Sequence, residues 1–301
     1  MMSHFIRIAL TLACCVFPGL LRAVTMGEAQ ELFSAKRYAE ARGAFEQLAA
    51  AEPNNAEAAY RLGLLAIRRD APDDAVTWLE KATALSPRSA PFFQALGDAY
   101  GISAQKAGLF SKLGFARKCR VAYEQAVSLD PENIEARYSL FTYCRQAPAI
   151  AGGGLDKARV QALEIQKRDV VQGSLALAEL SVAEKKYDDA FAILEDLRRS
   201  HPAALTATYQ IGRTAAMSGL RLDQGEAALK EYLATTPDDN QAPLWAAHWR
   251  LGQILEKKGN PAAARSEFEA ALKLNPTQPQ LLEAMRRLNQ AAPPSASGQP
   301  G

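Results

Sequence analysis

Histidine and cysteine are scarce in this sequence of 301 residues, which has three histidines and four cysteines. Only His201 and His248 lie beyond the first 23 residues, and no CxxC pair is present. The sequence therefore offers no ligand set for a metal site and little material for a catalytic triad. We expect no metal, no cofactor, no small-molecule substrate and no catalytic activity.

A long hydrophobic run is also lacking. The apolar run of residues 8–17 follows Arg7 and is shorter than the roughly 20 residues that a membrane span needs. It is followed by Pro18-Gly19 and the small Ala23. This order is typical of a secretory signal peptide, which we expect over residues 1–23, and Pro18-Gly19 argues against a buried first helix. The protein is then expected to cross the inner membrane, with the periplasm as its location.

The chain also lacks a strong net charge. Loss of Arg7 and Arg22 with the signal peptide would leave 33 basic residues against 33 acidic ones. A neutral protein has no long-range field that attracts DNA or RNA. We therefore do not expect nucleic acid as a partner.

What the chain does have is a repeat. Pro53 and Pro87, each at the end of a helix-like apolar segment, stand 34 residues apart, and a period of this length is typical of a stacked solenoid. Between the prolines, apolar residues fall at helical spacing in two blocks. The series continues with four later prolines: Pro131, Pro202, Pro237 and Pro276.

The clearest unit has Leu62-Gly63 and Ala66 in its first block, and its second block contains Ala75, Leu79 and Ala82. This pattern resembles the tetratricopeptide repeat, a helix-turn-helix unit in which a small residue such as Gly63 lets the second helix approach closely. The resemblance covers about residues 27 to 289 as seven units. The fourth, residues 134–170, is inferred from the gap, because Phe141 stands where a small residue is expected.

The resemblance implies an all-α fold, a right-handed superhelical solenoid over residues 24–289. Gln280 to Asn289 is typical of the capping helix that closes a repeat array. Residues 290–301, rich in proline, serine and glycine, have nothing to bury and are expected to be disordered.

Three consecutive glycines, Gly152 to Gly154, lie in an insertion over residues 147–156 between the two helices of the fourth unit. A Walker loop needs GxxxxGK followed by Ser or Thr after a strand, whereas here Ala158 follows Lys157. We expect a structural turn with left-handed backbone angles, after which Asp156 starts the next helix. An anion-binding nest at that helix N-terminus is the alternative.

A second insertion, over residues 102–118, lengthens the third unit. Its apolar residues, among them Phe110 and Phe115, interleave with lysines and arginines. The simpler interpretation is two longer helices whose extra apolar residues pack around Gly108. The alternative is a projecting basic and apolar elbow that contacts a membrane surface or a partner.

Cys119 and Cys144 fall on neighbouring helices of units three and four. A disulfide between them is geometrically allowed in an oxidising compartment. Cys119 occupies the small-residue position of a helix contact, which favours two buried thiols.

In tetratricopeptide proteins the first helices line a concave groove, so the resemblance implies a protein or peptide partner bound there. Tyrosine, tryptophan and arginine, which dominate interface energetics, are frequent at the inward positions. The alternative is that some of these rings only fill gaps between helices. The candidate groove residues are Tyr60, Leu64, Arg68, Asp98, Tyr138, Arg145, Tyr209, Arg213 and Trp249.

The paired Asn and Lys residues with which some chaperone-binding family members hold two carboxylates are absent, so that ligand is not expected. We predict a scaffold or assembly factor at the cell envelope. The alternative is an enzyme accessory or lipid-contacting protein that uses the elbow around Phe110.

Overall fold

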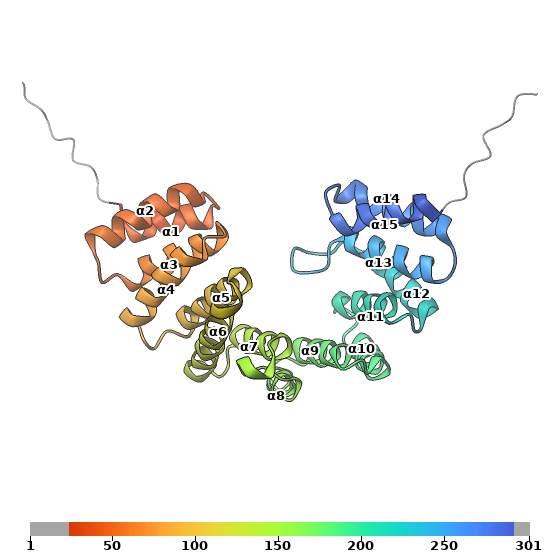
Figure 1. Ribbon diagram of the computed structural model, residues 1–301, viewed down its shortest axis with the longest axis horizontal. Coiled ribbons are helices and arrows are strands. Elements are labelled where there is room, and N and C mark those ends of the chain that lie inside the picture. The colour runs from red at the N-terminus through yellow and green to blue at the C-terminus, as the bar shows by residue number, and fades with distance from the viewer. Residues whose placement is uncertain (1–23, 292–301) are drawn as a thin grey trace, which may run out of the picture. The chain divides into compact units, whose positions relative to one another are not determined.

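The computed structural model describes residues 24–291, in which the chain forms fifteen α-helices, one short 3-10 helix and no strand (Figure 1). The predicted all-α class is confirmed. The predicted signal peptide lies outside the described residues, as does the predicted disordered tail from residue 292 on. Residues 290 and 291, predicted to be disordered, are helical because the last helix runs to Ala291. The elements are α1 (Met26–Ser34), α2 (Tyr38–Ala51), α3 (Ala56–Arg68), α4 (Pro72–Leu85), α5 (Ala90–Lys106), α6 (Leu109–Leu129), α7 (Ile134–Gln146), η1 (Ala149–Ala151), α8 (Leu155–Gln166), α9 (Val170–Ala183), α10 (Tyr187–Ser200), α11 (Leu205–Ser218), α12 (Leu222–Leu233), α13 (Leu244–Lys257), α14 (Pro261–Leu274) and α15 (Pro279–Ala291).

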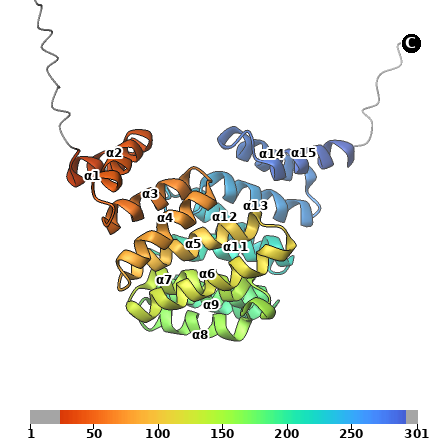
Figure 2. The ribbon, with the colours of Figure 1, turned by 60° about the vertical axis from the view of Figure 1, so that its left-hand side comes forward.

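The chain divides into two compact units between Ser86 and Pro87, where the sequence suggested one continuous array. The first unit holds α1 to α4 and the second holds α5 to α15. The helices pair in chain order within each unit, which gives seven pairs followed by α15. In the second unit each second helix also packs on the first helix of the next pair. Figure 2 gives a second view of these helices.

Three of the four neighbouring pairs of first helices in the second unit also contact one another: α5 contacts α7, α7 contacts α9, and α11 contacts α13, whereas α9 and α11 make at most marginal contacts. The second helices of consecutive pairs make at most marginal contacts in the described part of the chain. The first helices therefore lie on the inner side of this unit's curve, and side chains that leave them on that side share one face.

Close packing within a pair uses a glycine on the first helix. A Cβ atom on Gly63 would lie 2.4 Å from Leu79, and one on Gly252 would lie 2.4 Å from a ring carbon of Phe268. The role predicted for Gly63 is thus confirmed. Gly97 and Gly212 meet Tyr123 and Leu229 in the same way.

The fourth pair reaches the same packing with the sizes exchanged. Phe141 of α7 takes the glycine position and is fully buried, while Ala162 of α8 takes the position that Leu79 holds in its own pair and is also fully buried. A large residue now comes from the first helix and a small one from the second, which keeps the total volume nearly constant. The unit that was inferred from a gap is a complete helix pair.

The insertion of residues 102–118 lengthens both helices of the third pair, α5 to 17 residues and α6 to 21. This agrees with the simpler interpretation. The expected packing around Gly108 was wrong, however, because no heavy atom lies within 4 Å of a Cβ built there and Phe110 is 98% exposed. Phe115 does pack, with its ring centroid 6.4 Å from that of Tyr100. Across residues 24–291, the helices are all too short or too polar to cross a membrane.

Candidate partner-binding face

The glycine loop after α7 uses its own backbone donors. The N–H groups of Gly152, Gly153 and Gly154 donate to the carbonyl oxygens of Ala149, Pro148 and Cys144 over 2.8, 3.2 and 2.8 Å. An anion-binding nest needs such N–H groups free to point at the ligand. The loop is therefore a closed turn. Its three glycine N–H groups are already bonded and are not available to form the anion-binding nest.

The same loop shows why glycine is needed. Gly152 has a φ of 90°, in the left-handed region, and Gly154 has a φ of 144°. Gly153 instead permits close approach, because a Cβ there would lie 1.9 Å from the carbonyl oxygen of Ala147. Asp156 does not start the next helix as predicted, since α8 begins at Leu155 with Gly154 at its N-cap.

Both cysteines are buried free thiols, as predicted. Burial raises the pKa of Cys119 to about 12 and raises that of Cys144 as well. Thiolates are the reactive form of cysteine, so neither residue is suited to nucleophilic catalysis. Within the described chain, His, Cys, Asp and Glu residues do not gather in groups of three or more that could hold a metal ion.

Three of the predicted groove residues belong to α3 of the first unit. Tyr60 and Leu64 are half-buried and Arg68 is exposed. The Arg68 guanidinium lies 4.1 Å from the centroid of the Tyr38 ring, a cation–π distance. The other six belong to the first helices of the second unit.

Asp98 lies at the N-terminal end of the inner face of the second unit, beside a cavity of about 510 Å³ between α5, α6 and α7. The Tyr123 hydroxyl donates a hydrogen bond of 2.7 Å to the carboxylate of Asp98. Burial raises the pKa of Asp98, and the hydrogen bond from Tyr123 opposes this shift. The carboxylate of Asp98 thus joins α5 to α6, the two helices of its own pair.

Tyr138 and Arg145 of α7 both meet Glu179 of α9. The Tyr138 hydroxyl donates to Glu179 Oε1 over 3.1 Å, and Arg145 Nη2 lies 3.7 Å from Oε2. Burial, together with the charge of Glu179, raises the pKa of Tyr138 to about 12. Two predicted groove residues are therefore joined across repeats by the carboxylate of Glu179.

Tyr209 of α11 is only 8% exposed, and its ring centroid lies 5.4 Å from that of Tyr232. Its ring fills a gap between helices, which is the alternative that the sequence left open. Trp249 of α13 is half-buried and stacks on Trp245 with centroids 6.4 Å apart. Of these two aromatic side chains, Trp249 is the one that reaches the surface.

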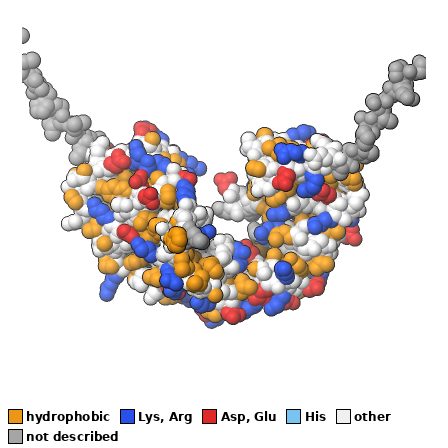
Figure 3. All heavy atoms as spheres, viewed as in Figure 1, with side chains coloured by type: hydrophobic (Ala, Val, Ile, Leu, Met, Phe, Trp, Pro, Cys, Tyr) orange, Lys and Arg blue, Asp and Glu red, His pale blue; other side chains and the backbone are white. Residues whose placement is uncertain are grey.

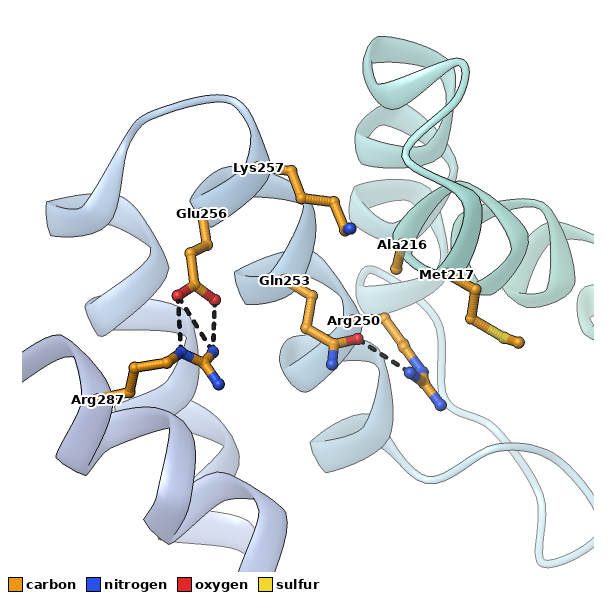
Figure 4. A pocket seen from close by; sticks show the side chains of 7 residues that line it. All are labelled: Ala216, Met217, Arg250, Gln253, Glu256, Lys257 and Arg287. Atoms are coloured by element: carbon orange, nitrogen blue, oxygen red, sulfur yellow. Dashed lines mark hydrogen bonds and ion pairs between the residues drawn. The ribbon is translucent and has the colours of Figure 1, made fainter.

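Arg250 is the inner-face residue that the sequence did not single out. Its guanidinium lies 4.1 Å from the centroid of the Trp249 ring, and its Nη1 donates to Gln253 over 2.9 Å. Figure 4 shows Arg250 and Gln253 in a cavity of about 590 Å³ lined by α11, α13 and α15, with Lys257 extending toward α11. Arg213 of α11 is held alike, by a bond of 3.0 Å to Gln210. The sequence signal that could have identified Arg250 is an Arg and a Gln three residues apart, a pair that occurs on both α11 and α13.

Comparison with known proteins agrees with this architecture. Tetratricopeptide repeat family models match residues 26–90 and 245–278. The chain is a tetratricopeptide repeat protein. No curated protein sequence matches it.

Several solved structures are similar to this tetratricopeptide repeat protein. One is a tetratricopeptide repeat protein from Parabacteroides merdae, with 15% identity, a TM-score of 0.67, and coverage of 87% of this chain and 96% of that chain. Yeast Tom70 has 15% identity and a TM-score of 0.64 over 85% of this chain and 52% of its own. The APC/C hetero-tetramer Cut9-Hcn1 has 12% identity and a TM-score of 0.56 over 87% and 48%. At these identities the likeness shows the fold alone.

Proposed function

We propose that the second unit binds a protein or peptide segment along the inner face of its first helices and serves as a scaffold or assembly factor without catalysis of its own. The observation that carries the proposal is the half-buried stack of Trp245, Trp249 and Arg250 on α13. Aromatic and arginine side chains that are fixed in place but still reach solvent are typical binding anchors. The solved Cut9-Hcn1 assembly, which has a similar fold, is a hetero-tetramer.

The test compares anchor variants with a surface control. A partner is first captured by cross-linking in cells, and its affinity is then measured for Tyr138→Ala, Trp249→Ala and Val160→Ala. Val160 is 56% exposed and lies on the second helix α8. Loss of a packed aromatic anchor costs about 2 kcal/mol, so each anchor variant should bind roughly thirtyfold more weakly.

Circular dichroism and thermal unfolding must show that all three variants fold like the wild type. Normal binding by both Tyr138→Ala and Trp249→Ala would remove the inner face from the proposal.

We also propose that residues 1–23 are a signal peptide and that the protein acts in the periplasm at the cell envelope. Support comes from the order of basic, apolar and small residues before Val24. Mass spectrometry of the exported protein should find Val24 at its N-terminus. An intact Met1 would contradict the assignment.

A second candidate function is peripheral contact with an anionic membrane through the start of α6. Phe110 is 98% exposed there, and residues 99–123 contain five basic residues and no acidic one. Figure 3 shows hydrophobic side chains gathered over α5 and α6. An exposed aromatic ring beside basic residues suits an anionic bilayer, where each basic residue near the surface contributes about 1 kcal/mol.

Co-sedimentation with phosphatidylglycerol vesicles tests this candidate. Phe110→Ser should reduce binding severalfold, whereas Val160→Ser, at an exposed position of α8, should not. Equal binding to neutral phosphatidylcholine vesicles, or no loss with Phe110→Ser, would rule out the contact.

A further inference from the structure

The inner face of the second unit contains arginine donors without acceptors. Among the described residues, the Nε atoms of Arg145 on α7 and Arg250 on α13 are buried and lack a hydrogen-bond partner. A buried donor that remains unpaired costs about 1–3 kcal/mol, and more when it is charged. The two Nε atoms are closed to solvent, as are those of Arg120 and Arg137, so a ligand would meet the remaining, partly exposed part of the Arg145 and Arg250 side chains.

Two arginines of this face have no carboxylate partner among the described residues. Glu256 lines the same cavity as Arg250 but pairs with Arg287. Glu179 lies near Arg145, at 3.7 Å, but within residues 24–291 no carboxylate oxygen lies within ion-pair distance of Arg213 or Arg250. The charge of Arg213 acts on both Arg250 and Tyr138, so these side chains lie within electrostatic range of one another across α7, α11 and α13. Burial is the main cause that lowers the pKa of Arg250. The strip is a partly desolvated, positively charged surface.

Gln210 and Gln253 set the orientation of two of these arginines. Each glutamine accepts a hydrogen bond from Nη1 of its arginine, over 3.0 Å for Arg213 and 2.9 Å for Arg250. Tyr209 is a further side-chain hydrogen-bond partner of Arg250, whose Nε has no partner among the described residues. Guanidinium groups that are held in place by neutral side chains keep their charge available for hydrogen bonds to a carboxylate.

We propose that the strip of Arg145, Arg213 and Arg250 recognises the carboxylates of an extended acidic peptide segment that lies along the first helices. The inference rests on the proposed binding function and specifies the chemistry of the partner. A peptide is favoured over a membrane because the strip follows the inner side of the unit's curve, whereas a bilayer would need an outward or flat face. The rings of Trp245 and Trp249 next to Arg250 would pack against the apolar residues between the acidic ones.

The probe is a fluorescent peptide in which glutamate alternates with alanine, and its binding is followed by fluorescence anisotropy. Matched peptides with glutamine or lysine in place of glutamate serve as comparisons. The glutamate peptide should bind at least tenfold more tightly than either. Its affinity should decrease when the salt concentration is raised from about 0.15 M to about 1 M, because the Debye length shortens from roughly 8 Å to 3 Å.

Matched protein variants locate the site. Arg250→Gln should weaken binding of the glutamate peptide about tenfold, and Arg250→Lys, which keeps the charge but loses the planar guanidinium, should weaken it less. Arg199→Gln is the control, because Arg199 is 76% exposed on α10 and pairs with Asp196 outside the strip. Equal losses with Arg250→Gln and Arg199→Gln would overturn the proposal.

A display library of random peptides separates failure of this inference from failure of the proposed function. If wild-type protein enriches peptides that Trp249→Ala no longer binds, but those peptides carry no excess of Asp and Glu, the inner face binds peptides and the acidic assignment is wrong. If Tyr138→Ala and Trp249→Ala enrich the same peptides as the wild type, the proposed function itself fails. Binding to phosphatidylglycerol vesicles that is lost with Arg250→Gln, without peptide binding, would replace the peptide by a lipid headgroup.

Discussion

The two insertions of the second unit behave in opposite ways. The glycine loop after α7 places all three glycine N–H groups on carbonyl oxygens of its own turn, and the Tyr143 hydroxyl and Lys157 ammonium hold two more of its carbonyls. The start of α6 instead leaves Phe110 98% exposed. A conspicuous sequence motif therefore became closed structure, whereas an unremarkable run of apolar and basic residues left an open surface. Satisfied polar groups and exposed apolar area distinguish the two, and neither can be read from residue types alone.

The largest effect should come from Gly153→Ala, which tests whether the closed loop is rigid. The new Cβ would overlap the carbonyl oxygen of Ala147, 1.9 Å away, and backbone cannot move aside as a flexible side chain can. We expect a loss of about 3 kcal/mol in the free energy of unfolding, at the upper end of overpacking costs. Urea denaturation measures it.

Gly114→Ala is the matched control in the other insertion. Gly114 lies within α6 with no heavy atom within 4 Å of an added Cβ, so alanine there should stabilise the protein by about 0.5–1 kcal/mol. Similar effects at the two positions would mean that the loop yields easily, and the contrast between the insertions would then be lost.

Repeat units were predictable because their signals are local and repeated. Positions such as Gly63, Leu79 and Pro87 recur at similar distances along the chain in successive units, and seven helix pairs follow the predicted order. Phe141 shows the limit of that pattern, because its size is compensated by Ala162 on the other helix of the pair. A position-by-position comparison with the repeat cannot see that exchange.

The inner face was only partly predictable. Carrying over inward positions selected Tyr138 and Arg145, both of which contact Glu179 in the structure. It could not tell that Tyr209 is covered by Tyr232, because the two rings come from different helices of a pair. It also missed Arg250, whose importance depends on which of its nitrogen atoms find acceptors.

A smaller effect should separate the two phenylalanines of the open insertion. Phe115 is half-buried against Tyr100, so Phe115→Ala should cost about 1–2 kcal/mol of unfolding free energy. Phe110→Ala should change it by less than about 0.5 kcal/mol, because the ring contacts almost only solvent. Thermal and urea unfolding of the two variants check this. A large loss with Phe110→Ala would show that the ring is packed and that the insertion is closed.

The smallest expected effect is a pH dependence at Asp98, which lies under the open insertion between α5 and α6. Burial raises the pKa of its carboxyl above the usual value of 3.8, even though the hydrogen bond donated by the Tyr123 hydroxyl lowers it. Cys119 also lies close to this carboxyl. The folded state therefore holds this proton more tightly than the unfolded state does.

The corresponding stability is present below about pH 4 and is lost as the pH rises through the folded-state pKa. Asp98→Asn keeps an acceptor for Tyr123 but cannot ionise, so it should lack this loss. The difference in unfolding free energy, wild type minus Asp98→Asn, should decrease as the pH rises above 4 and then level off. Urea titrations at a series of pH values measure that difference. An increase with pH would instead mean that the hydrogen bond from Tyr123 outweighs burial and stabilises the ionised carboxylate.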